Sequence, residues 1–546
     1  MSVIKYQFNC PTRDGYVDAD CLYQIADGIR YGFLTEENRK QAKRLQIPEL
    51  NSGMDAVYWL CGQEVTRLVS DDKGCFASWD SEGEIPVTFV TDVPAEGNYQ
   101  VKVAVTAQGA VSDAMIYLGR RRLAWRGSLA AGERFEGTFL TNICPIVPRT
   151  YSDAMEDLTL DITVIGRGLH LTAAEVSPWQ GPTLYIAGDS TVTDQSADYP
   201  YLPGSSYCGW GQMISAFLGT QMAVSNHSHS GLTTESFRTE GHYDILINRI
   251  KEGDICLFQF GHNDQKLMHL MADGGYRDRL ADYIREIKEK GARPVLVTPL
   301  ARNSWKGNDG SYNDLLEPFD RACIRLAKDS DIPVLHLHQK SMDFVAAQGR
   351  ESAKRFFFPS DYTHSNDYGA YLFAGYVYGE LAANGLVNGE MLPAWMPPAE
   401  LPVLSIPEEY ASMENPNAEH LFEGLERPQE HATRTDALEF VITAMHFFPT
   451  NVYNDMFEDV IGHELYAGTV ECAYQNGLIP DEMVKDGKLH PDWPVTGGEF
   501  IEILRNGYQS RKSDAVDVAA ITPEGFDEKA PIARGVAAEI CKKLHI

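Results

Sequence analysis

Residues 183–191 read TLYIAGDST, and they give the clearest indication of the fold in the middle of the chain. Its first part, TLYIA, is a short apolar strand that ends at Gly188, where a polar turn begins. Further apolar runs follow at 255–260, 294–298 and 333–337. Helical stretches lie between them, at 277–290 and 312–328. This alternation of strands and helices predicts an α/β domain with a parallel sheet covered by helices on both faces.

Four polar segments in this part of the chain hold candidate catalytic side chains. They are Gly188-Asp189-Ser190-Thr191, Ser230-Gly231, Gly261-His262-Asn263-Asp264 and Asp361-Tyr362-Thr363-His364. The first and third segments come directly after strands, and the fourth precedes a predicted helix at 367–383. Because the active site of such a sheet lies at the carboxyl ends of its strands, we expect the segments to meet there.

The residue types in these segments fit together as one catalytic set. A hydroxyl nucleophile needs a base, and the base needs a carboxylate that fixes its tautomer. Ser190 supplies the hydroxyl, His364 the base and Asp361 the carboxylate. The backbone N–H groups of Ser190 and Gly231 and the side chain of Asn263 are candidate donors to the oxyanion of an acyl transfer. The set predicts a serine hydrolase that needs no cofactor.

Each segment also has a simpler interpretation when it is taken alone. A Gly-Asp-Ser turn after a strand is common, Gly-His-Asn-Asp can be a turn with Asx hydrogen bonds, and an isolated Asp-x-x-His is usually a solvated pair. A metal site is another alternative, built from His227, His229, His262 and His364. The chain has no HExxH motif and no cysteine cluster, so the sequence favours the hydrolase and predicts no metal.

Together the segments resemble those of the SGNH hydrolases, also called GDSL-type esterases. The Ser, Gly, Asn and His of that name would be Ser190, Gly231, Asn263 and His364. The flanking residues are most similar to the rhamnogalacturonan acetylesterase-like carbohydrate esterases. This similarity rests on Thr191-Val192 and on the stretches 236–241, 258–266 and 361–370. It covers about residues 180–388 and implies removal of acetyl groups from plant cell-wall sugars through an acetyl-serine intermediate.

One residue departs from the pattern of that family. Its second segment often has an arginine after the glycine, which could meet an acidic sugar, whereas Leu232 follows Gly231 here. With a net charge of -30, this favours neutral acetylated oligosaccharides, such as xylan or mannan fragments, over a highly charged pectin backbone. The candidates for sugar contact are Trp210, Gln212, His262 and Gln265.

The predicted hydrolase domain, at 179–388, follows a region rich in short strands. Runs at 86–90, 99–105 and 158–164 within residues 1–178 predict a β-sandwich. This region resembles the β-domain that precedes the hydrolase in bacterial relatives. It is either a carbohydrate-binding module or a structural domain that packs on the active site. Candidates for stacking on a sugar are Trp79, Trp125 and Trp179.

After the hydrolase domain, residues 389–430 form a proline-rich linker. Residues 431–546 are predicted to be a helical domain, which resembles a degenerate surface-layer homology module. The segment 433–440 returns in similar form at 495–501, which indicates one repeat and part of another. We expect this domain to support oligomerisation or to shape the rim of the active site.

The composition excludes several kinds of partner. With 77 acidic and 47 basic residues, the chain repels nucleic acid and anionic membranes. No apolar run is long enough to span a membrane. Ten cysteines without a paired motif, and an N-terminus without an apolar signal segment, predict reduced thiols and a cytoplasmic location. The expected partner is an acetylated oligosaccharide substrate, and the chain could form a homo-oligomer.

Two other functions are alternatives to a carbohydrate acetylesterase. The same scaffold could hydrolyse lipid or aryl esters, although the sequence shows no obvious apolar lid. The protein could instead be a non-catalytic glycan-binding protein, which the complete set of catalytic residue types argues against.

Overall fold

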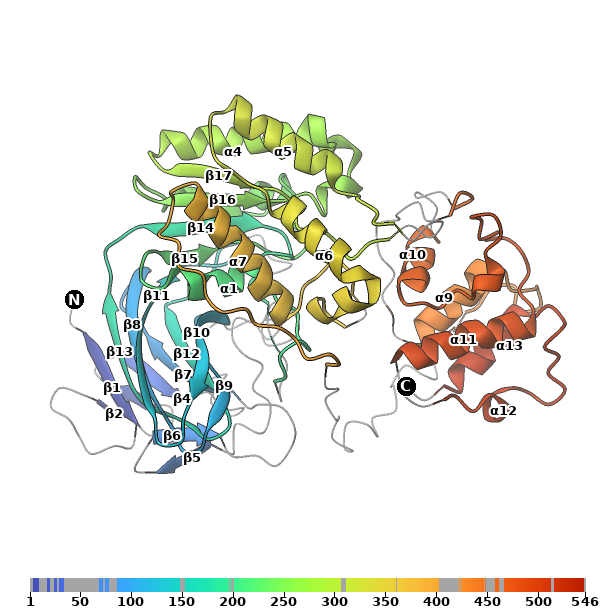
Figure 1. The fold of residues 1–546 in the computed structure, drawn as a ribbon, viewed down its shortest axis with the longest axis horizontal. Coiled ribbons are helices and arrows are strands. Elements are labelled where there is room, and N and C mark those ends of the chain that lie inside the picture. The colour runs from blue at the N-terminus through green and yellow to red at the C-terminus, as the bar shows by residue number, and fades with distance from the viewer. Residues whose placement is uncertain are drawn as a thin grey trace. The chain divides into compact units, whose positions relative to one another are not determined.

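The computed structural model describes most of the chain, which divides into two compact units (Figure 1). The first unit is Met1–Arg302 with Leu316–Leu404, and the second is Asn303–Leu315 with Ser405–Ile546. The described residues are 3–8, 17–19, 24–26, 29–33, 68–71, 74–77, 86–147, 153–195, 197, 201–305, 311–359, 361–401, 422, 424–445, 447, 457–460, 466–511 and 515–544.

The N-terminal part of the first unit consists of two mainly antiparallel sheets. Its strands are β1 (Ile4–Phe8), β2 (Val17–Ala19), β3 (Gln24–Ala26), β4 (Ile29–Phe33), β5 (Leu68–Asp71), β6 (Gly74–Ala77), β7 (Val87–Asp92), β8 (Gly97–Ala107), β9 (Val111–Leu118), β10 (Arg122–Leu129), β11 (Arg134–Ile143), β12 (Thr159–Ile165) and β13 (Leu169–Pro178). One sheet has the order β11-β8-β13-β1-β2, with β6 on β13 and β5 on β6, and the other β10-β9-β12-β7-β4-β3. Alternate residues of both sheets, such as Phe8, Val103 and Ile162, share one apolar core.

A five-stranded sheet forms the centre of the rest of this unit, and all its pairings are parallel. Its strands are β14 (Thr183–Gly188), β15 (Ala223–Asn226), β16 (Ile255–Gln259), β17 (Arg293–Val297) and β18 (Val334–Leu335). Their order is β15-β14-β16-β17-β18. Every residue of β14 and β16 is buried, as expected for strands covered on both faces. This confirms the predicted parallel sheet.

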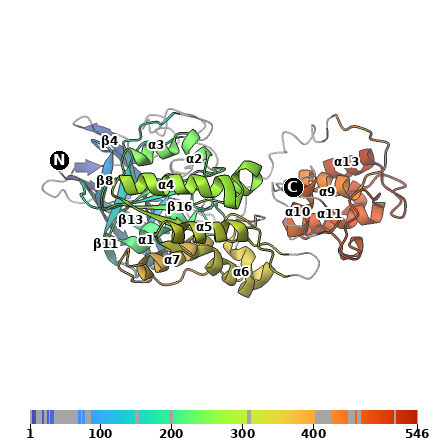
Figure 2. The same ribbon diagram turned by 90° about the horizontal axis from the view of Figure 1, so that it is seen from above.

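Helices cover this sheet on both sides (Figures 1 and 2). They are α1 (Trp210–Leu218), α2 (Ser236–Thr239), α3 (His242–Ile247), α4 (Arg277–Glu289), α5 (Glu317–Asp329), α6 (Leu337–Ala353) and α7 (Asp367–Ala383), with the short turns η4 (Asp264–Lys266), η5 (Met268–Leu270), η6 (Ala272–Tyr276) and η7 (Lys354–Phe356). In Figure 1, α4 and α5 lie on one side of the sheet and α1 and α7 on the other. Helix α4 buries Leu280, Tyr283, Ile284 and Ile287, the spacing of one apolar helix face.

The turn between β9 and β10 connects the N-terminal sheets to the part of the unit that is built on the parallel sheet. Its Arg121 is buried and forms an ion pair with Asp367, the first residue of α7. The same guanidinium donates to the carbonyl of Tyr207 over 2.6 Å. The backbone carbonyl of Arg121 accepts a 3.0 Å hydrogen bond from Gln212 of α1. These contacts support the structural interpretation of the N-terminal region, because its turn holds elements that flank the catalytic segments.

Loss of the Arg121 guanidinium is expected to destabilise the first unit. In Arg121→Met the buried Asp367 carboxylate would lose its counter-charge, which typically costs about 3–5 kcal/mol of unfolding free energy. Urea unfolding followed by fluorescence measures this loss. The control is Arg134→Met, which removes an exposed ion pair with Glu136 and should cost less than about 1 kcal/mol. Equal small losses in both variants would show that the turn is not a structural tie.

The second unit has an internal threefold repeat. Its helices are α9 (Arg434–Ala444), α10 (Ala467–Gln475), α11 (Gly497–Arg511), α12 (Val518–Ile521) and α13 (Arg534–Lys542), with the short turn η9 (Asp481–Met483). Just before α9, α11 and α13, three segments bond in a closed ring. Ala432 N–H donates to Ile532, Ile532 N–H to Val495, and Val495 N–H to Ala432, over 2.9, 3.0 and 3.0 Å. The sequence predicted one repeat and part of another, whereas three segments of the chain take part in this ring.

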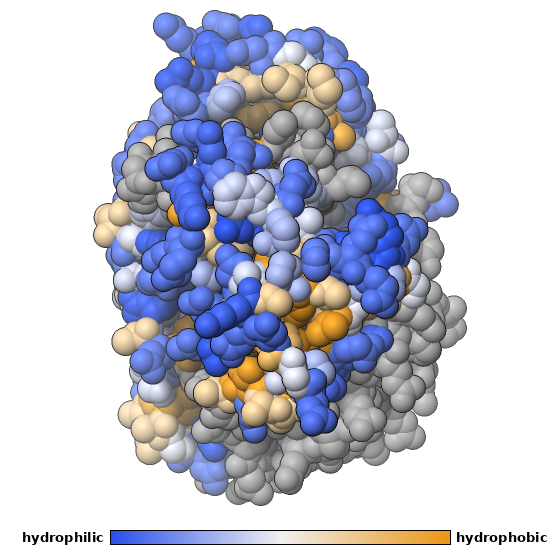
Figure 3. Space-filling view, turned by 90° about the vertical axis from the view of Figure 1, so that its right-hand side faces the viewer, coloured by the Kyte–Doolittle hydropathy of each residue, from blue (hydrophilic) through white to orange (hydrophobic). Residues whose placement is uncertain are grey.

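Polar groups dominate the face of the molecule that Figure 3 shows, with apolar surface gathered in its lower half. Within the described part of the chain, every helix is too short or too polar to span a membrane. The six cysteines whose side chains are described are free and buried.

Candidate active site

Three side chains from the first and fourth polar segments form a continuous hydrogen-bonded line, which we call the catalytic line. Ser190 Oγ lies 2.7 Å from His364 Nε2, and His364 Nδ1 lies 2.7 Å from Asp361 Oδ2. Ser190 follows β14, whereas the other two precede α7, so the line joins residues that are 174 positions apart in sequence. Hydroxyl, imidazole and carboxylate in this order are the arrangement that lets an imidazole take a proton from a hydroxyl.

The loop before α7 fixes the orientation of the Asp361 carboxylate. Its Oδ1 accepts the backbone N–H groups of Thr363 and His364, over 2.8 and 2.9 Å. Its Oδ2 is thereby directed at the imidazole. Helix α7 begins immediately after this loop because the side chain of Asn366 caps it, accepting from the N–H of Gly369. A short, internally bonded turn therefore presents both members of the pair.

Burial and charge act in opposite directions on this pair. Burial acts to lower the pKa of His364, but the neighbouring Asp361 carboxylate outweighs it and raises that pKa. Burial acts to raise the pKa of Asp361, but the imidazole and the hydrogen bonds to the carboxylate lower it. Asp361 therefore stays ionised wherever His364 acts as a base.

The raised pKa of His364 predicts where activity falls on the acid side of the pH profile. His364 can take the Ser190 proton only when it is neutral, so activity should fall as the pH drops through the pKa of His364. Because that pKa is raised, the fall should be centred above about 6.5, the ordinary value for histidine. The dependence of kcat/KM on pH reports the ionisation in the free enzyme. A fall centred at or below about 6.5 would contradict the predicted effect of Asp361.

The turn that carries Ser190 is stabilised by hydrogen bonds to a buried carboxylate. The buried Asp189 carboxylate accepts the N–H and the hydroxyl of Thr191, over 3.0 and 2.8 Å. Glycine is required at 188, since a Cβ there would lie 2.8 Å from the carbonyl oxygen of Gln259 on the next strand. The turn can therefore pass close to β16 and leave Ser190 at the carboxyl edge of the sheet.

The three candidate oxyanion donors come from three different loops. The backbone N–H groups of Ser190 and Gly231 make no hydrogen bond to any described residue. Gly231 has φ of 86°, a left-handed conformation that favours glycine. The Asn263 side chain donates one of its N–H groups to the carbonyl of Leu232 over 3.0 Å. This bond ties the loop after β16 to the loop that carries Gly231.

Two of the four candidates for sugar contact are fully buried, which corrects the prediction for them. Trp210 is 0% exposed, and its indole N–H donates to Gln259 over 2.8 Å. Gln212 is also 0% exposed, and its amide bonds the carbonyls of Gln195 and Arg121. Both side chains face inward from the first turn of α1, so they brace the site instead of lining it.

The other two candidates for sugar contact, His262 and Gln265, lie close to Asn263 in the sequence. His262 is buried and its Nδ1 lies 3.2 Å from Asp189 Oδ2, while its Nε2 has no partner among the described residues. Burial lowers the pKa of His262, so the ring is neutral and Nε2 is an acceptor. Gln265 is partly exposed and donates to the carbonyl of His262 over 3.1 Å.

Tyr207 belongs to the site although the sequence did not indicate it. Its ring meets that of His364 edge-on, with centroids 5.5 Å apart, and its hydroxyl lies 3.4 Å from Asp361 Oδ2. Its ring also stacks on that of Phe358, with centroids 3.7 Å apart. Tyr207 lies in an irregular loop, and no spacing relates it to the catalytic segments. A sequence pattern alone could therefore not have identified it.

Two of the three tryptophans proposed for sugar stacking, Trp125 and Trp179, have contacts apart from the catalytic residues. Trp125 stacks on Phe135 with ring centroids 4.0 Å apart, which covers one of its faces. Trp179 covers Gly181, where a Cβ would lie 2.1 Å from the indole. It lines a pocket of about 220 Å³ with residues that include Asn98 and Asn142. Trp79 lies outside the described residues.

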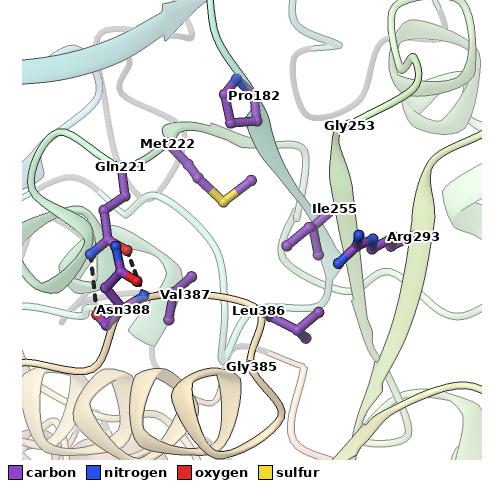
Figure 4. A pocket seen from close by; sticks show the side chains of 10 residues that line it. All are labelled: Pro182, Gln221, Met222, Gly253, Ile255, Arg293, Gly385, Leu386, Val387 and Asn388. Carbon is purple, nitrogen blue, oxygen red and sulfur yellow. Dashed lines mark hydrogen bonds between the residues drawn. The ribbon is translucent and has the colours of Figure 1, made fainter.

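A second pocket, of about 390 Å³, lies at the other edge of the parallel sheet (Figure 4). Pro182, Ile255 and Arg293 line it, at the amino ends of β14, β16 and β17. Ser190 follows the carboxyl end of β14, and a strand of six residues spans about 20 Å. This pocket is therefore separate from the catalytic line.

The histidines considered for a metal site have other contacts. His227 Nε2 lies 2.9 Å from the Ser225 hydroxyl, and His262 and His364 each bond a carboxylate. In the described ranges, no group of three or more His, Cys, Asp or Glu side chains is placed to hold a metal ion.

Comparison with known proteins places the catalytic line in a family. Residues 186–372 match the GDSL-like Lipase/Acylhydrolase family. The rhamnogalacturonan acetylesterase RhgT of Bacillus subtilis is 34% identical over 174 residues, which are 32% of this chain and 72% of that protein. The probable rhamnogalacturonan acetylesterase YesY of the same organism is 31% identical over 198 residues, 34% of this chain and 86% of that protein.

A third relative extends over more of this chain. The Bacillus subtilis protein named "Uncharacterized esterase YxiM" is 27% identical over 309 residues, which are 55% of this chain and 75% of that protein. The matched family segment contains all the catalytic candidates, from Ser190 to His364. The chain therefore belongs to the GDSL-like lipase/acylhydrolase family, whose members are also called SGNH hydrolases, and it is an esterase.

Proposed function

We propose that the protein is a carbohydrate O-acetylesterase that removes acetyl groups from plant cell-wall oligosaccharides. The observation that carries this proposal is the line Ser190–His364–Asp361, with 2.7 Å between each pair of reacting groups. The similarity to two proteins named as rhamnogalacturonan acetylesterases supports acetylated sugar as the substrate class.

The geometry supports a two-step hydrolysis. Ser190 Oγ attacks the acetyl carbonyl while His364 Nε2 takes its proton, and Asp361 stabilises the resulting imidazolium. The imidazolium then gives the proton to the departing sugar oxygen, which leaves the acetyl group on Ser190. Water attacks this ester with His364 again as the base, and acetate is released. In both steps the N–H groups of Ser190, Gly231 and Asn263 would stabilise the oxyanion.

The charges beside the site favour an acidic sugar backbone over a neutral one. Burial lowers the pKa values of His262 and Lys266, the Asp189 carboxylate opposes both shifts, and the positive charge of Arg302 adds to them. Arg302 is buried and follows β17, so its guanidinium lies close to the catalytic edge of the sheet. Leu232 stands where the family often has an arginine, but Lys266 and Arg302 supply positive charge near the site. Rhamnogalacturonan, whose backbone carries carboxylates, is therefore our first expected substrate.

Acetate release from a panel of acetylated oligosaccharides tests this function. The panel contains rhamnogalacturonan, xylan and mannan fragments at equal acetyl concentration. The proposal expects the highest kcat/KM on rhamnogalacturonan fragments and a lower value on the neutral ones. Release from none of the three would overturn the carbohydrate assignment. A preference for xylan or mannan would overturn the proposed role of Lys266 and Arg302 in favouring an acidic sugar.

An apolar surface next to the site favours a second candidate, hydrolysis of aryl or lipid esters. Directly after Lys266, Leu267, Met268 and Met271 are 39%, 91% and 60% exposed. This exposed set was not evident from the sequence, and such residues can contact a longer acyl chain. A series of p-nitrophenyl esters separates the two candidates. The acetylesterase predicts kcat/KM highest for acetate, whereas a maximum at longer chains would favour the second candidate.

A further inference from the structure

The Asn263 side chain is held in one orientation by two contacts of opposite kind. Its Nδ2 donates to the backbone carbonyl of Leu232 over 3.0 Å, and its Oδ1 accepts from the Lys266 ammonium over 3.0 Å. A backbone carbonyl can only accept and an ammonium can only donate. Both contacts therefore require the same assignment of oxygen and nitrogen in the amide.

This orientation decides whether Asn263 can act in an oxyanion hole. With one N–H bonded to Leu232, the second N–H of the amide remains for the substrate. The flipped amide would turn its carbonyl oxygen toward the developing negative charge and would repel it. The bond from Lys266 opposes this flip, because the flipped amide would set its NH₂ group against the ammonium. The positive charge of the Lys266 ammonium, next to Oδ1, also polarises the amide and strengthens its N–H as a donor.

We propose that Lys266 is a positioning residue that holds and polarises the Asn263 amide as an oxyanion donor. This inference rests on the proposed function, since it needs Asn263 to bind the oxyanion. Lys266 ends the short turn η4, three residues after Asn263, so the backbone already places its side chain next to the amide. Its ammonium donates to Asn263 and to no other described residue. Lys266 is exposed as a whole residue, so it has little structural role in the core, but neighbouring protein atoms remove part of the hydration of its ammonium.

The surroundings of the ammonium give the proposal a pH dependence. Loss of hydration lowers the pKa of Lys266 to about 8, with Arg302 lowering it further and Asp189 opposing the shift. Below this pKa the side chain is an ammonium, which cannot accept a hydrogen bond and so favours one orientation of the amide. Above it the neutral amine can accept as well as donate, and would tolerate either orientation. Activity should therefore fall on the alkaline side near pH 8.

Steady-state kinetics of four variants on p-nitrophenyl acetate tests the proposal. Lys266→Met should lower kcat by about 10- to 100-fold, the loss of one charge-assisted hydrogen bond, with little change in KM. Lys266→Arg should recover most of this loss and move the alkaline fall to higher pH, because a guanidinium stays charged. Asn263→Ala should lose about 10²–10³-fold in kcat. The double variant should be no worse than Asn263→Ala, since Lys266 acts through that side chain.

The control is Lys290→Met, an exposed lysine at the end of α4, which should keep native kcat. Native kcat in Lys266→Met together with an impaired Asn263→Ala would overturn the role of Lys266 and leave the proposed function standing. Losses that multiply in the double variant would also overturn it, since Lys266 would then act independently of Asn263. Native kcat in Asn263→Ala would instead refute the oxyanion assignment in the proposed function.

Discussion

Replacing Ser190 with alanine is expected to lower kcat for acetyl ester hydrolysis by at least about 10⁴-fold. The hydroxyl lies 2.7 Å from His364 Nε2, and no other described side chain takes its place as a partner of that nitrogen. Without Ser190 Oγ there is no nucleophile to form the acetyl intermediate, whereas the imidazole pair and the oxyanion donors remain. Activity on p-nitrophenyl acetate, measured with trace-contaminant controls, gives the size of the loss.

A fluorophosphonate that labels activated serines provides an independent readout for the same variant. The native protein should be labelled at Ser190 and the alanine variant should not react. Ser128→Ala is the matched control, because Ser128 is exposed on β10 and its hydroxyl donates to the Ser112 carbonyl, away from the catalytic residues. It should keep native activity and labelling. Labelling of Ser190→Ala at native level would show that another residue is the nucleophile.

Asp361→Asn is expected to cost about 10³–10⁴-fold in kcat while the fold is kept. Oδ1 of Asp361 accepts two backbone N–H groups, so the amide oxygen of the asparagine would occupy that position. Its NH₂ group would then face His364 Nδ1 and would favour the tautomer with the proton on Nε2. That tautomer cannot take a proton from Ser190, because Nε2 no longer has a free lone pair.

The pH profile and a matched variant identify the cause of this loss. In Asp361→Asn the pKa of His364 should fall, because burial still lowers it and the carboxylate that raises it is gone. Tyr207→Phe, which removes only the hydroxyl 3.4 Å from the same carboxylate oxygen, should cost less than about tenfold. An Asp361→Asn variant with near-native kcat would mean that His364 does not need this partner.

The sequence predicted those parts of the structure that local patterns determine. The strands are short apolar runs, and β14 ends at the glycine that lets the chain turn beside β16. Ser190 and His364 could be paired in advance because parallel strands and the loop before α7 bring their segments to one edge. The rest depends on tertiary contacts that leave no local pattern. Arg121 reaches Asp367 across 246 positions, and Tyr207 reaches Asp361 across 154.

Two differences between the predictions and the structure have separate physical causes. Trp210 and Gln212 stand beside a catalytic segment in sequence, but the first turn of α1 directs them into the interior. Proximity along the chain does not decide which face of a helix meets the substrate. In the second unit, Ile532 joins the hydrogen-bonded ring with Ala432 and Val495, a third segment that the sequence pattern did not indicate. Backbone hydrogen bonds of this kind do not require particular side chains.

We propose that this esterase removes acetyl groups from a cell-wall sugar through Ser190. The decisive measurement is acetate release from acetylated rhamnogalacturonan oligosaccharides, by the native protein and Ser190→Ala side by side. We expect steady release by the native protein and none above background by the variant. Equal release by both proteins, or no release by the native protein, would contradict it.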